Sequence, residues 1–177
     1  MTGDRPIIRP SRDADVAAVA AIYGHHVRHG VASFEEIPPT LEEIGRRRCE
    51  ILARGLPYLV AERDGRVVGY CHAAPFRPRT GYRFTLEDSI YVDAADVGRG
   101  IGRALLTPLL AQCAALGYRQ IVAVIGGRET VASIRLHEAL GFAHVGVFES
   151  VGFKFGRWID IVLMQRALGE GAARLPE

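Results

Sequence analysis

Val97-Gly98-Arg99-Gly100-Ile101-Gly102-Arg103 is the stretch of sequence that decides how this chain folds. It follows a β-branched and aromatic run at residues 85–92 and precedes apolar residues at helical spacing, so it joins a strand to a helix. Glycines at such a junction let the backbone approach a ligand closely, and the free N–H groups of the helix start favour an anion. The stretch predicts a phosphate or pyrophosphate site. The alternative is a glycine turn that serves close helix–strand packing.

The spacing of the glycines excludes two common phosphate loops. The dinucleotide fingerprint G-x-G-x-x-G needs a third glycine where this chain has Arg103 or Leu105. The Walker A loop needs Lys followed by Ser or Thr after its last glycine, and here Arg103 and Ala104 follow Gly102. Arg99 and Arg103 are placed to meet further phosphates.

Strands and helices alternate on both sides of the loop. Helical spacing predicts helices over residues 16–27, 40–54, 100–116 and 130–140. Strands are expected at residues 6–9, 58–63, 66–74, 85–92, 120–125, 145–151 and 158–165. Asp64-Gly65 predicts a tight hairpin, because both central residues of a type I′ turn need positive φ. The pattern indicates a single mixed α/β domain over residues 1–168 and a frayed tail over residues 169–177.

The composition excludes several classes of protein. The chain has 177 residues and a net charge of +2, which gives no general case for nucleic-acid binding. No apolar run approaches the length of a membrane span, and the first residues lack the apolar core of a signal peptide. The expected location is therefore cytoplasmic. Three widely spaced cysteines are expected to be reduced and buried: Cys49, Cys71 and Cys113.

Ordered motifs resemble the GNAT superfamily of N-acetyltransferases. Tyr91-Val92 with residues 98–106 is similar to its acetyl-CoA motif, and residues 84–92, 133–142 and 151–160 resemble the phosphinothricin and methionine sulfoximine or sulfone acetyltransferases. The resemblance spans residues 5–168. It implies the GNAT acyl-CoA N-acyltransferase fold, with a mixed sheet of about seven strands and about four helices. It also implies acetyl transfer from acetyl-CoA to a small amino acid or analogue, no metal, and a homodimer.

The resemblance also implies roles for individual residues. Glu87 would be the general base and His137 the acid that protonates the departing thiolate. The alternatives are an ordinary strand carboxylate and a structural histidine. The implied acetyl-CoA contacts are Ile90, Tyr91, Val92, Gly98, Arg99, Gly100, Ile101, Gly102, Arg103, Thr130 and Ser133. The implied substrate contacts are Phe34, Glu35, Thr80, Gly81, Tyr82 and Arg83.

Two positions depart from the family pattern. Val97 stands where the loop usually begins with Gln or Arg, and Thr130 stands where relatives usually carry Asn. Thr130 is expected to cap the following helix and to offer its hydroxyl to CoA. These departures keep a second hypothesis open, a GNAT-like module that binds acyl-CoA without turnover. A third is an acetyltransferase that acts on protein or peptide N-termini or on polyamines.

Several charged residues complete the set of candidates. Arg77, Arg83 and Lys154 are possible partners for a substrate carboxylate or phosphinate, which arginine would bind with two hydrogen bonds. His25 and His29 share a helix face with no further ligands nearby, so metal binding is not expected. The run of arginines at 46–48 predicts a solvated helix face.

Overall fold

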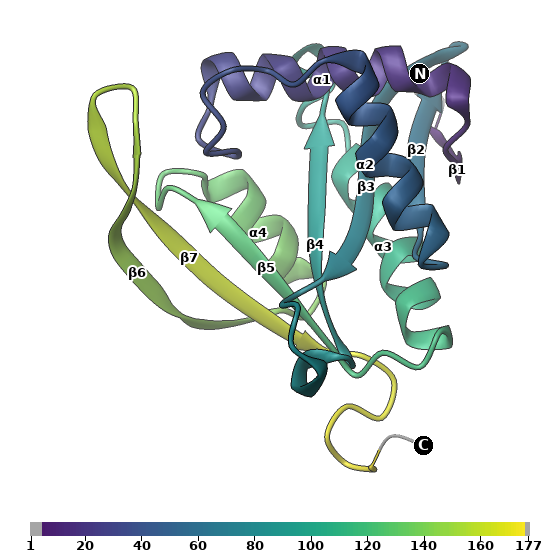
Figure 1. Cartoon of the computed structure of the whole chain (residues 1–177), viewed down its shortest axis with the longest axis vertical. Helices are drawn as coiled ribbons and strands as arrows, with labels where there is room; N and C mark the ends of the chain where they lie inside the picture. The colour runs from purple at the N-terminus through teal and green to yellow at the C-terminus, as the bar shows by residue number, and fades with distance from the viewer. Residues whose placement is uncertain (1–4, 176–177) are drawn as a thin grey trace.

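Seven strands form one sheet in the order β1-β2-β3-β4-β5-β7-β6 (Figure 1). The computed structural model describes residues 5–175 of the chain. The strands are β1 (Ile7–Pro10), β2 (Tyr58–Arg63), β3 (Arg66–Pro75), β4 (Thr85–Val92), β5 (Gln120–Gly126), β6 (Ala143–Lys154) and β7 (Arg157–Ala167). The helices are α1 (Val16–His29), α2 (Leu41–Ala53), α3 (Ile101–Ala115) and α4 (Val131–Ala139). The mixed α/β class expected from the sequence is confirmed.

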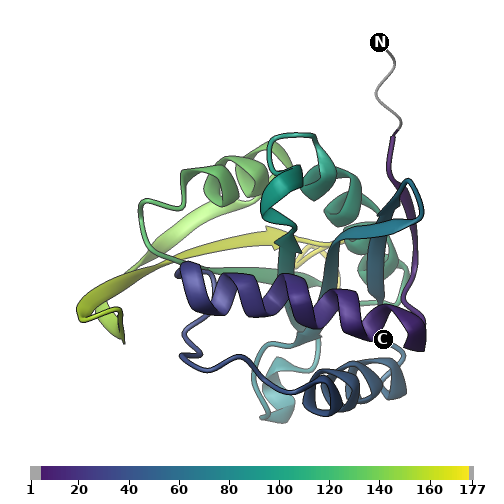
Figure 2. The same cartoon turned by 90° about the horizontal axis from the view of Figure 1, so that it is seen from above.

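Helices cover both faces of the sheet (Figure 2). Alternate residues of a strand point to opposite faces, so β2 sends Leu59 and Ala61 into one apolar core and Tyr58 and Val60 into another. The first core packs against α3, and the second packs against α1 and α2. The central strands therefore stand between two apolar layers, which fixes which of their side chains can reach each layer.

Local turn chemistry sets the joints between these elements. Asp64 and Gly65 have φ values of 51° and 71°, which confirms the expected hairpin. Gly117 and Gly141 follow α3 and α4 with φ values of 87° and 82°. Within residues 5–175, no helix is long and apolar enough to cross a membrane.

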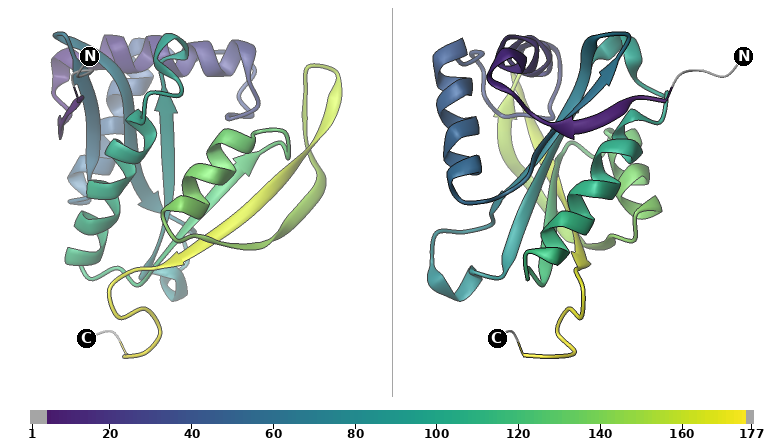
Figure 3. Two further views of the ribbon diagram at one scale, coloured as in Figure 1. Left: turned by 180° about the vertical axis from the view of Figure 1, so that it is seen from behind. Right: turned by 90° about the vertical axis from the view of Figure 1, so that its right-hand side faces the viewer.

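The β6–β7 hairpin extends away from the rest of the sheet (Figure 3). Its turn is Phe155-Gly156, and both residues have positive φ. In β6 only Gly152 and Lys154 are buried. Exposed apolar side chains of the hairpin form one surface, with Phe155 from the turn and Trp158 from β7 beside those of β6: Val145, Val147, Phe148, Val151 and Phe153.

Two expectations about burial were wrong. Cys49 is exposed on α2, whereas Cys71 and Cys113 are buried as expected. Arg48 is 5 % exposed and is not part of a solvated face. Its guanidinium donates to the hydroxyl and carbonyl oxygens of Ser11 and to a carboxylate oxygen of Asp13, each at 2.7 Å. Residues 176–177 of the expected tail lie outside the described residues.

Candidate active site

The site is built where β4 and β5 separate (Figure 1). Their parallel pairing runs from Thr85 and Gln120 to Asp88 and Ala123 and then ends. Beyond that point β4 stays paired with β3 as far as Val92, and β5 stays paired with β7 as far as Gly126. The two strands thus diverge around a gap. A cavity of about 730 Å³ lies there, lined by residues of both strands, α3 and α4.

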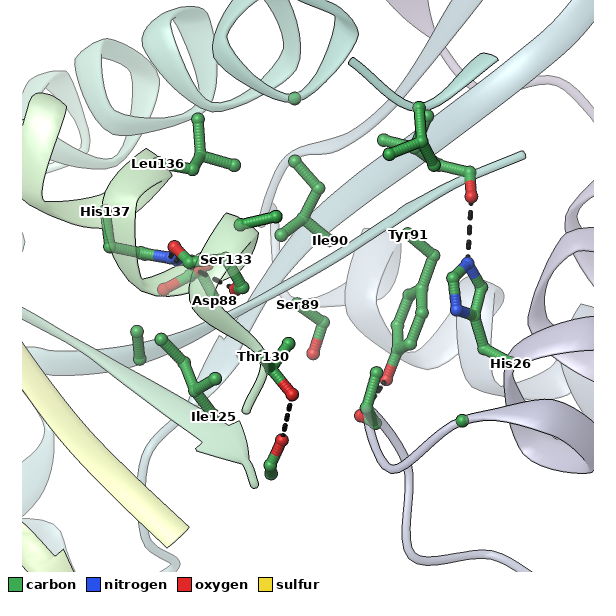
Figure 4. A pocket seen from close by; sticks show the side chains of 18 of the residues that line it. His26, Asp88, Ser89, Ile90, Tyr91, Ile125, Thr130, Ser133, Leu136 and His137 are labelled. Carbon is green, nitrogen blue, oxygen red and sulfur yellow. Dashed lines mark hydrogen bonds and ion pairs between the residues drawn. The ribbon is translucent and has the colours of Figure 1, made fainter. Parts of the chain in front are cut away.

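The backbone of β4 faces this gap with polar groups. The N–H of Asp93, the residue after β4, donates to the carbonyl of Val68 in β3. Neighbouring residues of a strand direct their backbone groups to opposite edges, so Ile90 and Val92 direct theirs into the gap. The carbonyl of Val92 accepts a hydrogen bond from Nε2 of His26 at 2.8 Å (Figure 4). The N–H groups of Ile90 and Val92 are positioned to meet a carbonyl or amide in the gap.

The glycine loop forms the end of the cavity at the start of α3. Gly98 and Gly100 have φ values of 81° and 77°, which other residues rarely adopt. A Cβ on Gly102 would lie 2.8 Å from Cδ2 of Leu136 on α4. The first N–H groups of a helix lack intrahelical partners, and here they open on a cavity lined by Val97, Gly98 and residues 100–103. The loop is suited both to an anion and to close packing of α3 against α4.

Arg99 does not line this cavity. It is exposed and lies 3.4 Å from the carboxylate of Asp96, which also contacts Arg63 at 3.5 Å and Arg66 at 2.5 Å. Asp96 is 3 % exposed and ends the short 3₁₀ helix η3 (Ala94–Asp96). It anchors the glycine loop to β2 and β3. Sequence analysis missed this residue, because nothing local distinguishes it from a surface carboxylate.

Helix α4 supplies the opposite wall. Thr130, Ser133, Leu136 and His137 line the cavity (Figure 4). The hydroxyl of Thr130 donates to the carbonyl of Gly126 at 2.6 Å, so its side chain does not cap α4 as expected. Its hydroxyl proton is used within the protein, and only its oxygen lone pairs remain for a ligand.

His137 and Asp88 form a buried pair in this wall. The His137 side chain is 2 % exposed; its Nδ1 lies 2.7 Å from the carbonyl of Ser133 and its Nε2 lies 3.0 Å from Oδ2 of Asp88 (Figure 4). Both ring nitrogens therefore face acceptors, which requires a proton on each or a protonated Asp88. Burial lowers the pKa of His137, but the hydrogen bond and charge of Asp88 outweigh it and leave that pKa raised. The geometry favours an imidazolium paired with a carboxylate, whose Oδ1 has no hydrogen-bond partner among the described residues.

Glu87 lies on the opposite face of β4 from Asp88, as strand alternation predicts. It is half-buried and lines the same cavity. Burial raises the pKa of its carboxyl, the charge of Asp88 adds to this, and Arg77 opposes it. A carboxylate with a raised pKa is a better proton acceptor than an exposed one.

A second cavity, of about 880 Å³, lies on the α1 and α2 side of the sheet. Its lining is rich in aromatic and basic side chains: Tyr23, Tyr58, Tyr70, His72, Tyr82, Tyr91, Arg47, Arg54, Arg77, Arg79 and Arg83. Ser89 and Tyr91 line both cavities, so the two spaces adjoin at β4 next to Glu87. Burial lowers the pKa of His72 to about 4, which leaves this ring neutral.

The residues predicted to contact substrate are divided between the cavities. Phe34 lines the first, and Thr80, Tyr82 and Arg83 line the second. Gly81 lies between Thr80 and Tyr82 in the short 3₁₀ helix η2 (Thr80–Tyr82), without lining either cavity.

Two further candidates are occupied within the protein. Glu35 pairs with Arg47 at 2.6 Å. Lys154 is buried, and its ammonium donates to two backbone carbonyls, so it is not available to a substrate carboxylate. Within residues 5–175, no group of three or more His, Cys, Asp or Glu side chains is arranged to hold a metal ion.

Comparison with known proteins identifies relatives over nearly the whole length. Residues 8–163 match the family model described as "Acetyltransferase (GNAT) domain". The chain is 54% identical to phosphinothricin N-acetyltransferase of Alcaligenes faecalis, covering 96% of this chain and 86% of that one. It is 40% identical to the L-methionine sulfoximine/L-methionine sulfone acetyltransferase of Salmonella typhimurium, covering 94% and 96%.

A solved structure has the same fold. The GNAT superfamily phosphinothricin acetyltransferase from Sinorhizobium meliloti, crystallised in complex with AcCoA, superposes with a TM-score of 0.95. It is 46% identical in sequence, and the alignment covers 98% of this chain and 94% of that one.

Proposed function

Because the chain belongs to the GNAT acetyltransferase family, we propose that it transfers the acetyl group of acetyl-CoA to the amine of a small amino acid or analogue, with Glu87 as general base. Phosphinothricin, methionine sulfoximine and methionine sulfone are the lead acceptors. The observation that carries the proposal is the meeting of two cavities at β4, where half-buried Glu87 lies beside the residues shared by both.

The first cavity fits acetyl-CoA, which this enzyme uses as co-substrate. The free N–H groups at the start of α3 would bind the pyrophosphate, favoured by the helix dipole. The gap edge of β4 offers Ile90 and Val92 to the amides of the pantetheine arm. The N–H groups of Ile90 and Val92 would also stabilise the thioester oxygen as it gains charge. Val97, where relatives carry a polar residue, leaves this backbone cradle unchanged.

The second cavity, together with the part of the first that Phe34 and Glu87 line, fits an amino-acid acceptor with an anionic or strongly polar side chain. Arg77 and Arg83 would bind a carboxylate or phosphinate, and the tyrosines would enclose the carbon chain. From there the amine would reach Glu87 at the junction of the cavities. Glu87 accepts the proton of the ammonium group, directly or through water, and leaves a neutral nucleophile.

Acetyl transfer forms one bond and breaks another. The amine nitrogen forms a bond to the acetyl carbon, and the carbon–sulfur bond breaks. Glu87 holds the first proton that nitrogen loses, and the second, lost as the amide forms, passes directly or through water to the departing thiolate. Both N–H groups of His137 face Ser133 and Asp88, so the ring has no free N–H for the thiolate. Glu87 and the His137–Asp88 pair thus lie on opposite faces of β4, because Glu87 and Asp88 are consecutive residues.

Release of CoA thiol from acetyl-CoA tests this proposal. The acceptor panel contains the three lead compounds, a polyamine and a peptide with a free N-terminus. We expect turnover with at least one lead compound; release with the polyamine or peptide alone would refute the acceptor class, and binding without release would indicate a non-catalytic module. Glu87→Gln should lower kcat about 10²-fold or more and leave acetyl-CoA binding nearly unchanged. A rate within about twofold of wild type would refute Glu87 as base.

We propose a homodimer, supported by the apolar side chains that β6 and β7 expose. We also propose that residues 1–168 form a single domain and that the protein is cytoplasmic. Sedimentation equilibrium of the wild type and of Trp158→Ser tests the homodimer. A wild type that is monomeric at micromolar concentration would contradict it.

A further inference from the structure

Lys154 is the only lysine of the chain; the other basic residues among its 22 are arginines. It ends β6, and its side chain is 1 % exposed. Its Nζ donates to the carbonyl of Gly30 at 2.9 Å and to the carbonyl of Ser33 at 2.7 Å. Among the described residues no carboxylate pairs with it within 4 Å; Glu35 and Glu36 act only through their charge. The buried ammonium is thus satisfied by the backbone of a loop 121 residues or more away in sequence.

That loop, residues 30–36, forms part of the first cavity. Gly30, Val31, Ala32 and Phe34 all line it. Other side chains hold the loop from different directions. The hydroxyl of Tyr91 donates to the carbonyl of Ala32 at 3.3 Å, and the hydroxyl of Tyr23 lies 2.7 Å from Oγ of Ser33. The loop is therefore attached to β4 and α1 as well as to β6.

The end of the β6–β7 hairpin is shaped to meet this loop. Gly152 and Lys154 share one face of β6 and are its only buried residues. A Cβ on Gly152 would lie 2.1 Å from Cε2 of Phe34, so the ring packs directly on the backbone of β6. On the other side, a Cβ on Gly126 would lie 3.2 Å from Cε1 of the same ring. The ring of Phe34 is therefore held between β6 and β5, and Lys154 holds the loop that carries it.

We propose that Lys154 is a positioning residue that sets the size of the acceptor admitted to Glu87, by holding the 30–36 loop and with it Phe34 in the cavity wall. Lys154 itself does not line the cavity, so it acts through Phe34. A lysine suits the place, because one compact ammonium group can serve two carbonyls that a planar guanidinium would not fit equally. This inference rests on the proposed function, since it concerns the acceptor of that reaction.

Lys154→Met tests the proposal, since it keeps the length and volume and removes both hydrogen bonds. The acceptors are methionine sulfone and ethionine sulfone, which is one methylene longer. An apolar wall discriminates one methylene by about 10-fold or more. We expect Lys154→Met to reduce the preference for the shorter acceptor at least about fivefold and to raise its KM at least about tenfold. The KM for acetyl-CoA should stay within about twofold, because the glycine loop is not touched.

Two further variants separate positioning from general damage. Arg46→Met is the matched control, because Arg46 is an exposed basic residue of α2 that lines neither cavity. Gly152→Ala displaces the ring of Phe34 while leaving Lys154 in place, and it should change the same preference. Amide hydrogen exchange over residues 30–36 should be faster in Lys154→Met than in the wild type and unchanged in Arg46→Met.

The outcomes distinguish this inference from the proposed function. A wild type that releases no thiol with any of the three lead compounds would overturn the proposed function and with it the acceptor-size role, while hydrogen exchange would still decide whether Lys154 holds the loop. A folded Lys154→Met with exchange, KM and acceptor preference within about twofold of wild type would overturn the inference while the proposed function stands. If Lys154→Met does not fold, Gly152→Ala decides, and an unchanged preference there would overturn it.

Discussion

Replacing Asp88 by Asn should destabilise the protein at acidic pH far more than at alkaline pH. The change keeps the shape of the side chain and removes the carboxylate that lies 3.0 Å from Nε2 of His137. Leaving one charge of a buried pair without its partner costs about 3–5 kcal/mol if that charge stays. His137 can avoid part of this by releasing its proton, so the loss should approach the value of one hydrogen bond to a charged group, about 2–3 kcal/mol.

The pH dependence follows from the direction of the pKa shift. Asp88 raises the pKa of His137 in the folded state, so the pair stabilises the fold below the unfolded pKa of histidine. That contribution is lost as the pH rises through the raised pKa of His137 in the folded state. In the wild type at alkaline pH, the ring of His137 is neutral. One of its nitrogens then carries a lone pair and still faces an acceptor oxygen of Ser133 or Asp88. In Asp88→Asn, the side-chain amide can donate to this lone pair of His137. The difference in unfolding free energy between the variant and the wild type should therefore shrink to about 1 kcal/mol or less.

Urea denaturation followed by circular dichroism at about pH 5.5 and pH 9 measures this difference. At the lower pH we expect a loss of about 2–3 kcal/mol, or about 4–12 °C in Tm for a chain of this size. Glu138→Gln is the matched control, because it removes the carboxylate of an exposed pair with His144 at 2.9 Å. It should change stability by less than about 1 kcal/mol at either pH. An equal loss at both pH values in Asp88→Asn would refute the charged pair.

Three further predictions concern other parts of the molecule. Gly100→Ala should weaken acetyl-CoA binding and lower stability by about 1 kcal/mol or more, measured by calorimetry, because φ is 77° there; unchanged binding would contradict the role of this turn. Arg77→Met should shift the acidic limb of the kcat–pH profile upward, because Arg77 lowers the raised pKa of Glu87; a downward shift would contradict this. Iodoacetamide should modify Cys49 alone in the native protein, seen by mass spectrometry, because burial raises the pKa of the other two thiols, that of Cys113 to about 12; modification of either buried cysteine would contradict it.

Local signals in the sequence predicted the elements and their joints well. The Asp64-Gly65 hairpin and the helix ends at Gly117 and Gly141 depend on φ values that only neighbouring residues decide. The glycine loop before α3 is of the same kind. Strand alternation likewise predicted that Glu87 and Asp88 point to opposite faces of β4.

The errors arose where distant contacts decide the environment of a side chain. Arg48 belongs to a run of arginines, yet Ser11 and Asp13 take it into the interior. Cys49, the next residue, is exposed because the helix turns it away from that contact. Lys154 was a candidate for a substrate anion, but it binds the carbonyls of a loop more than a hundred residues earlier.

The sequence by itself determined the family, the order of elements and the place of the glycine loop, because these depend on short spacings and backbone preferences. Only the tertiary structure decided the opening between β4 and β5, the pairing of Asp88 with His137 and the fixing of the 30–36 loop by Lys154. The physical reason is the same in each case. A gap in a sheet, a buried charge and its partner are products of packing between residues far apart in the chain, and spacing along the sequence carries no record of which of them meet.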